Sequence, residues 1–81
     1  MSDSSFDQTL DVQGLKCPQP MLKTKKALAK MEPGQRVLVL ATDPHALRDL
    51  SQFSDQTGNK LVSSEEKDGV FRIIMERKQN S

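Results

Sequence analysis

Cysteine is scarce in this sequence: Cys17 is the only one among 81 residues. A lone cysteine excludes an internal disulfide, and the absence of a C-x-x-C pair excludes dithiol redox chemistry within the chain. Together with the only histidine, His45, it cannot complete a closed zinc site built from Cys and His ligands. We therefore expect neither a metal nor a cofactor.

Aromatic residues, net charge and long apolar runs are also scarce. Three Phe and no Trp or Tyr leave few side chains to stack on bases, and a formal net charge of +1 does not favour nucleic acids or membranes. No apolar run approaches the roughly 20 residues that span a bilayer. The polar, acidic start lacks the order of a secretory signal. These absences predict a cytoplasmic protein without stable nucleic-acid or membrane binding.

The patterns that are present predict one small α+β domain over residues 8–77, with tails at 1–7 and 78–81. Strand patterns occupy four segments: residues 8–12, 36–42, 60–66 and 70–77. The last two are joined by the turn sequence "KDG", which is typical of a hairpin.

Two helices are expected between these strands. The first begins at Pro18, because proline suits the first helical position, and it ends at "EPG", residues 32–34. The second begins at Pro44 with Asp43 as its N-cap and ends at Gly58. The order β-α-β-α-β-β with right-handed crossovers predicts a two-layer α/β sandwich, in which a mixed four-stranded sheet carries both helices on one face. The other sheet face is then either polar or used in a contact.

The first helix has two distinct faces. Its apolar face is formed by five residues: Met21, Thr24, Ala27, Leu28 and Met31. The opposite face carries Lys23, Lys26 and Lys30. This lysine stripe is either a solvated helix face or a docking surface for an acidic partner or RNA. In the second helix, Phe53 lies on the apolar face and is expected in the core.

Cys17 stands just before the first helix. The positive end of the helix dipole and the free backbone N–H groups, which we expect from Gln19 and Met21, favour the thiolate there, and Lys16 adds positive charge. We therefore predict an accessible thiol with a low pKa. The alternative is that Cys17 is a small buried hydrophobe.

No obvious base accompanies this thiol. A Cys–His pair would require the two helix starts to converge, and we interpret His45 as a surface residue at the second helix start. A lone thiolate without a base suits the carrying of a group, either sulfur or an acyl or alkyl adduct.

The stretch "LDVQGLKCPQPMLKTKKAL" resembles the signature D-x-x-G-x-x-C-P-x-P of the TusA/SirA family of small sulfur carriers. The matching residues are Asp11, Gly14, Cys17, Pro18 and Pro20. The similarity continues through "MEPGQRVLVLATDPHALRDLSQF" and covers residues 8–77. The family's fold is the same sandwich, similar to the C-terminal domain of translation initiation factor three.

The resemblance implies a function. In this family the cysteine accepts sulfane sulfur as a persulfide from a cysteine desulfurase and passes it to a cysteine of a downstream relay protein. The best-known destination is 2-thiouridine at the tRNA wobble position, while other members feed molybdenum-cofactor enzymes or sulfur oxidation. Such a protein is a covalent carrier rather than a multiple-turnover enzyme. Ser54 stands where some relatives carry a second cysteine, which fits a one-cysteine relay.

Residues around the motif receive supporting roles. Asp11 and Gly14 are expected to shape the loop into Cys17, with Gly14 at positive φ, while Pro18 and Pro20 fix the backbone near the sulfur. We expect Pro20 to matter more for transfer than for folding. Charged candidates for docking partners on a monomeric carrier are Lys16, Lys25, Asp43 and Arg48.

Arg48 and Asp49 are candidates for a surface ion pair.

Two other function classes stay open beside the carrier. One is a non-catalytic adaptor or RNA-binding module on the same fold, and the other is a single-cysteine thiol enzyme such as a peroxidase.

Overall fold

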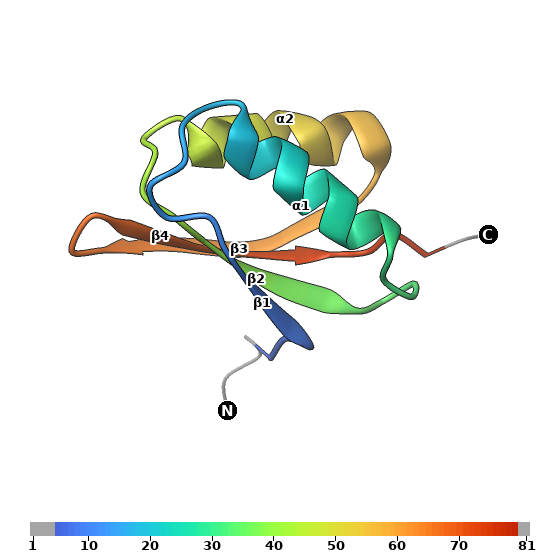
Figure 1. Ribbon diagram of the computed structural model, residues 1–81. Helices are drawn as coiled ribbons and strands as arrows, with labels where there is room; N and C mark the ends of the chain where they lie inside the picture. The colour runs from blue at the N-terminus through green and yellow to red at the C-terminus, as the bar shows by residue number, and fades with distance from the viewer. Residues whose placement is uncertain (1–4, 80–81) are drawn as a thin grey trace.

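The computed structural model describes residues 5–79, and its elements follow the predicted order. They are β1 (Gln8–Asp11), α1 (Gln19–Ala29), β2 (Arg36–Ala41), α2 (Ala46–Thr57), β3 (Lys60–Lys67) and β4 (Val70–Glu76). Both helices cover the same face of one four-stranded sheet (Figure 1). The predicted two-layer α+β sandwich is confirmed.

The sheet has the strand order β1-β2-β4-β3. β1 pairs in parallel with β2, and β4 runs antiparallel to both β2 and β3. The last strand of the fold therefore lies inside the sheet, between two strands that precede it in the chain. This position agrees with the apolar sequences of β2 and β4, because inner strands are the most buried.

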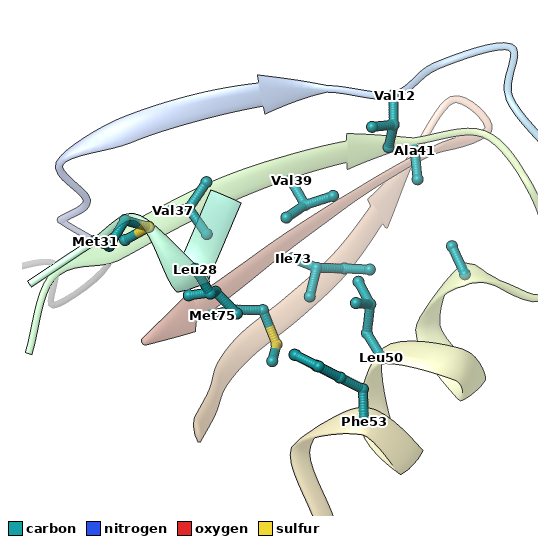
Figure 2. Packing of buried hydrophobic residues seen from close by; sticks show 11 residues of the cluster. Val12, Leu28, Met31, Val37, Val39, Ala41, Leu50, Phe53, Ile73 and Met75 are labelled. Carbon is teal, nitrogen blue, oxygen red and sulfur yellow. The ribbon is translucent and has the colours of Figure 1, made fainter. Parts of the chain in front are cut away.

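The core fills the space between the sheet and the two helices (Figure 2). Alternation along β2 and β4 turns Val37, Val39, Ile73 and Met75 toward the helices, and all four are fully buried. Phe53 of α2 is 6% exposed, so its predicted place in the core is confirmed. None of the described helices is long and apolar enough to cross a membrane.

Helix α1 begins one residue later than expected. Pro18 is the N-cap residue, Gln19 is the first helical residue and Pro20 is the second. The ring of Pro20 is fully buried, and its carbonyl accepts a hydrogen bond of 2.8 Å from the hydroxyl of buried Thr24. Pro20 is thus also a packing residue, which the sequence did not indicate.

Pro20→Ala is therefore expected to lower the free energy of unfolding by about 1–2 kcal/mol, because it removes buried ring atoms. A denaturant melt measures this change. Pro33→Ala, at an exposed position between α1 and β2, is the matched control and is expected to leave the melt nearly unchanged. A Pro20→Ala melt that overlays the wild type would show that the ring contributes little packing.

The sheet face away from the helices has an apolar centre. Leu38 and Ile74 pair directly across β2 and β4, and each is 4% exposed. Next to them on the same face, Arg36 Nε lies 2.9 Å from Glu76 Oε1 in an ion pair. The centre of this face is therefore a buried apolar pair with charged side chains beside it, so the face is not uniformly polar.

Candidate functional site

Two loops meet at one end of the sheet, and one of them carries Cys17. Because β1 and β2 are parallel, their C-terminal ends lie at the same end of the sheet, and the loops that follow them start there (Figure 1). The N–H of Gly14 donates to Thr42 Oγ1 at 2.9 Å. The N–H of Cys17 donates to Asp43 Oδ2 at 2.8 Å. The β2–α2 loop therefore supports the loop that carries the cysteine.

Asp11 and Gly14 lie at the start of the loop that leads to Cys17. Asp11 Oδ1 accepts a hydrogen bond of 3.0 Å from the N–H of Gln13, which closes a local turn at the end of β1. Gly14 has φ of 84°, in the left-handed region that glycine adopts without strain. A Cβ built on Gly14 would meet nothing within 4 Å, so backbone conformation and not space is what favours glycine there.

Cys17 lies exposed on a tight turn at the start of α1. The N–H of Gln19 donates to the carbonyl of Lys16 at 2.8 Å, which closes this turn around the cis peptide bond between Cys17 and Pro18. The expectation that the Gln19 N–H would serve the sulfur is therefore wrong. Exposure of the side chain also rules out the alternative that Cys17 is a buried hydrophobe.

The sulfur contacts a residue for which the sequence suggested a different partner. The S–H of Cys17 donates a hydrogen bond to Asp49 Oδ2 of α2, with a sulfur–oxygen distance of 2.7 Å. Asp49 was a candidate for a surface pair with Arg48, but among the described residues its carboxylate accepts a hydrogen bond from the thiol. Asp49 is half-buried, in the first turn of α2.

These contacts raise the pKa of Cys17 above its ordinary value. The largest cause is the hydrogen bond to Asp49, followed by partial loss of solvent and by the negative charges of Asp49 and Asp43; the charge of Arg48 acts in the opposite direction. The predicted low pKa is therefore wrong. The carboxylates of Asp49 and Asp43 outweigh the opposing charge of Arg48. The dipole effect on which the prediction relied is modest at an exposed helix end.

A signal for Asp49 was present in the sequence. It precedes Phe53 by four residues, so both lie on the same side of α2. Since Phe53 was expected to be buried, that side had to face the rest of the domain. Asp49 and Phe53 in fact line one small hollow between the helices together with Cys17, Pro18, Met21, Gln52 and Gln56.

Asp43 was expected to cap α2, and that expectation is wrong. The helix begins at Ala46, with His45 as its N-cap residue and no side-chain capping bond. The Asp43 carboxylate, which is 8% exposed, instead accepts from the Cys17 N–H and lies 3.4 Å from Nδ1 of His45. His45 is itself exposed, as expected of a residue at a helix start.

The charged candidates are placed unequally around the cysteine. Lys16 and Arg48 are exposed and border a second hollow beside the sulfur, lined by Gly14, Leu15, Lys16, Cys17, Thr42, Asp43, Pro44, His45 and Arg48. Lys25 is exposed on α1 but lines neither hollow at Cys17. Lys16 and Arg48 therefore lie beside the sulfur, whereas Lys25 does not, and the docking role of all three stays a prediction.

The lysine stripe of α1 lies apart from the cysteine. Lys23, Lys26 and Lys30 line a groove together with Gln8 and Leu10 of β1. The stripe thus borders an edge strand of the sheet, and both interpretations of it, a solvated face or a docking surface, stay open.

The raised pKa of Cys17 has a measurable consequence. Only the thiolate reacts with iodoacetamide, so the alkylation rate follows the thiolate fraction as pH rises. We expect the inflection of the rate profile above the free-thiol value of about 8.5, because the Asp49 hydrogen bond stabilises the protonated form. An inflection below that value would show that the helix dipole and the cations dominate in solution.

Fold and site together describe a small α+β domain with one exposed cysteine on a supported turn. The comparisons with known proteins agree with this description. The family model described as "Sulfurtransferase TusA" matches residues 8–77, and the chain belongs to that family of sulfur carriers.

Individual relatives are similar along most of their length. The chain is 45% identical to the sulfur carrier protein TusA of Allochromatium vinosum over 74 residues, which is 91% of this chain and 97% of that protein. It is 51% identical to a putative sulfur carrier protein of Neisseria meningitidis over 71 residues, covering 88% and 96% of the two chains. The crystal structure of a SirA-like protein from Desulfitobacterium hafniense superposes with a TM-score of 0.79 at 31% identity, covering 90% of this chain and all of that one.

Proposed function

We propose that Cys17 accepts sulfane sulfur as a persulfide from a cysteine desulfurase and passes it to a cysteine of a downstream relay protein. The observation that carries this proposal is an exposed thiol at the matched family position, on a turn of the β1–α1 loop that the β2–α2 loop supports. We further propose that the sulfur is used for 2-thiouridine at the tRNA wobble position. The monomeric state and the cytoplasmic location stay predictions from the sequence.

The loading step is a sulfur transfer without net oxidation. The Cys17 thiolate attacks the terminal sulfur of the donor's persulfide, the donor's S–S bond breaks, and the donor thiolate leaves. The proton that Cys17 gave up restores the donor thiol. The products are a persulfide on Cys17 and a free donor cysteine, so neither an oxidant nor a metal is consumed.

The peroxidase alternative is less well supported. Peroxide attack needs a high thiolate fraction, whereas the pKa of Cys17 is raised by the Asp49 hydrogen bond. A persulfide donor can compensate for this deficit by binding beside the cysteine, because bound reactants gain a high effective concentration. The adaptor alternative would require a function that does not depend on the thiol.

The test is to mix the protein with a cysteine desulfurase and free cysteine and to record the intact mass. We expect the mass to increase by one sulfur atom and to return to its starting value after treatment with a reductant. Digestion should place the added sulfur on the peptide that contains Cys17. An unchanged mass with an active desulfurase, or peroxide turnover in its place, would contradict the carrier function.

The tRNA destination needs a separate measurement. Deletion of the gene should lower the 2-thiouridine content of total tRNA, and a plasmid copy should restore it. Normal thiolation in the deletion strain would direct the sulfur elsewhere, such as to molybdenum-cofactor enzymes or sulfur oxidation, without contradicting persulfide loading.

Arg48 gives a testable docking prediction. Its side chain is exposed beside Cys17, and its charge favours the thiolate. We expect Arg48→Glu to slow sulfur uptake by about threefold or more and to weaken its salt dependence, because charges near an interface steer association. Lys78→Glu, an exposed change just past the end of β4 that borders neither hollow at Cys17, is the control. Equal rates for the two variants would remove Arg48 from the docking surface.

A further inference from the structure

The loading step needs only Cys17 and the donor's persulfide, yet Asp49 contacts the reacting sulfur. Its Oδ2 accepts a hydrogen bond from the thiol, with a sulfur–oxygen distance of 2.7 Å, although Asp49 lies 32 residues further along the chain. The neighbouring carboxylate of Asp43 engages the same residue through its backbone N–H. The cysteine is thus held by two carboxylates, one at the backbone and one at the sulfur.

The contact with Asp49 suits only one of the two states of a carrier. An empty carrier has an S–H group that donates to the carboxylate. A persulfide is a stronger acid than a thiol, so the loaded carrier bears a negative charge near neutral pH and has no proton to donate. The same carboxylate that stabilises the empty state therefore repels the loaded state.

Other charges near the sulfur do not cancel the preference of Asp49 for the empty carrier. Asp43 acts in the same direction as Asp49, whereas Arg48 acts against it. Lys16 and His45 border the hollow beside the sulfur and are both exposed. Of the charged side chains around Cys17, Asp49 is the one whose hydrogen bond to the sulfur depends on whether sulfur is loaded.

We propose that Asp49 favours hand-over of the sulfur, because its carboxylate accepts a hydrogen bond from the emptied thiol and repels the persulfide anion. This proposal rests on the proposed carrier function. In the hand-over step the acceptor thiolate attacks the terminal sulfur of the Cys17 persulfide, and the S–S bond to Cys17 breaks. The sulfur of Cys17 takes up the proton given up by the acceptor and donates it in a hydrogen bond to Asp49. The acceptor now carries the persulfide anion.

The equilibrium between the two states provides the test. Wild type and Asp49→Asn are each equilibrated with a mixture of glutathione and glutathione persulfide, and the loaded fraction is read from the intact mass. We expect the equilibrium constant for loading to rise about three- to tenfold in Asp49→Asn. This effect is at the low end of the range for hydrogen bonds to ionised groups, because the contact between Cys17 and Asp49 is exposed to solvent. Asp55→Asn removes the same charge at an exposed position of α2 and is expected to match the wild type.

A second measurement examines the contact without sulfur transfer. We expect the alkylation profile of Asp49→Asn with iodoacetamide to move to lower pH than that of the wild type, because the thiol loses the partner that stabilised its protonated form. Asp49→Ala, which cannot accept a hydrogen bond, should shift both measurements in the same direction. A denaturant melt of each variant identifies any that does not fold, and the folded one then provides the test.

The outcomes separate this proposal from the carrier function. Loading that is equal in wild type and in the Asp49 variants would overturn the role of Asp49 and leave the carrier function standing. An unshifted alkylation profile would overturn the contact itself. Failure of wild type and variants alike to load from glutathione persulfide or from a desulfurase would overturn the carrier function, and the proposed role of Asp49 with it.

Discussion

In Cys17→Ser, sulfur loading from a cysteine desulfurase is expected to fall to the background of the assay, while the fold is retained. A hydroxyl ionises far less readily than a thiol and cannot form a persulfide, so covalent carriage ends. The side chain is exposed, and serine keeps a donor for Asp49 at nearly the same volume. The midpoint of a denaturant melt should therefore match that of the wild type.

The same variant separates the carrier from the adaptor class. A strain that carries only Cys17→Ser should show the 2-thiouridine content of the deletion strain. If the variant instead restores tRNA thiolation without loading sulfur, the protein acts through binding and not through its thiol. Ser54→Ala is a control, because the hydroxyl of Ser54 donates to the carbonyl of Asn59 at 2.6 Å near the end of α2 and has no role in the proposed transfer.

Asp43→Ala is expected to slow sulfur uptake at saturating donor by at least about tenfold, because small misplacements of a reacting group reduce rates strongly. The substitution removes the acceptor of the Cys17 N–H, so of the two hydrogen bonds from the β2–α2 loop only the one to Gly14 is left. It should also lower the free energy of unfolding by about 1–3 kcal/mol, the penalty for a polar group left without its partner. Single-turnover kinetics beside a denaturant melt measure both effects.

Asp43→Asn keeps an oxygen that can accept from the Cys17 N–H and is expected to retain much of the uptake rate. A steering role for Asp43 would give a different result: both variants would slow association at low donor concentration and change its salt dependence, with normal rates at saturation. Since Asp43 is only 8% exposed, we expect the positioning result.

Most of the fold could be predicted because local patterns and topology rules agree. The apolar run of β2, the alternation in β4 and the turn between β3 and β4 set the strands, and right-handed crossovers put the helices on one face. The position of β4 between β2 and β3 was not specified, because strand order depends on contacts between distant segments. Helix starts were misplaced by one or two residues because Pro18 and Pro44 stand before the first helical turn rather than in it.

The site was predicted less evenly. The motif located Cys17, and glycine chemistry correctly gave Gly14 a positive φ. The state of the thiol could not be read in the same way, because the helix dipole and Lys16 are local in sequence, whereas Asp43 and Asp49 reach Cys17 only through the fold. The residues next to Cys17 in the sequence indicated a low pKa and a reactive thiolate. The carboxylates that lie near it in the fold raise the pKa instead.

The place of β4 inside the sheet has a consequence for synthesis on the ribosome. While the nascent chain ends before Val70, β2 has no partner on its β4 side and β3 has no neighbour at all in the sheet. A polypeptide that has emerged only through β3 thus exposes the apolar edge of β2 and lacks two core side chains, Ile73 and Met75. Because non-local strand pairs must wait for their partner, we expect folding to begin only after residues 70–76 have left the exit tunnel. Translational arrest before that point should leave a protease-sensitive chain.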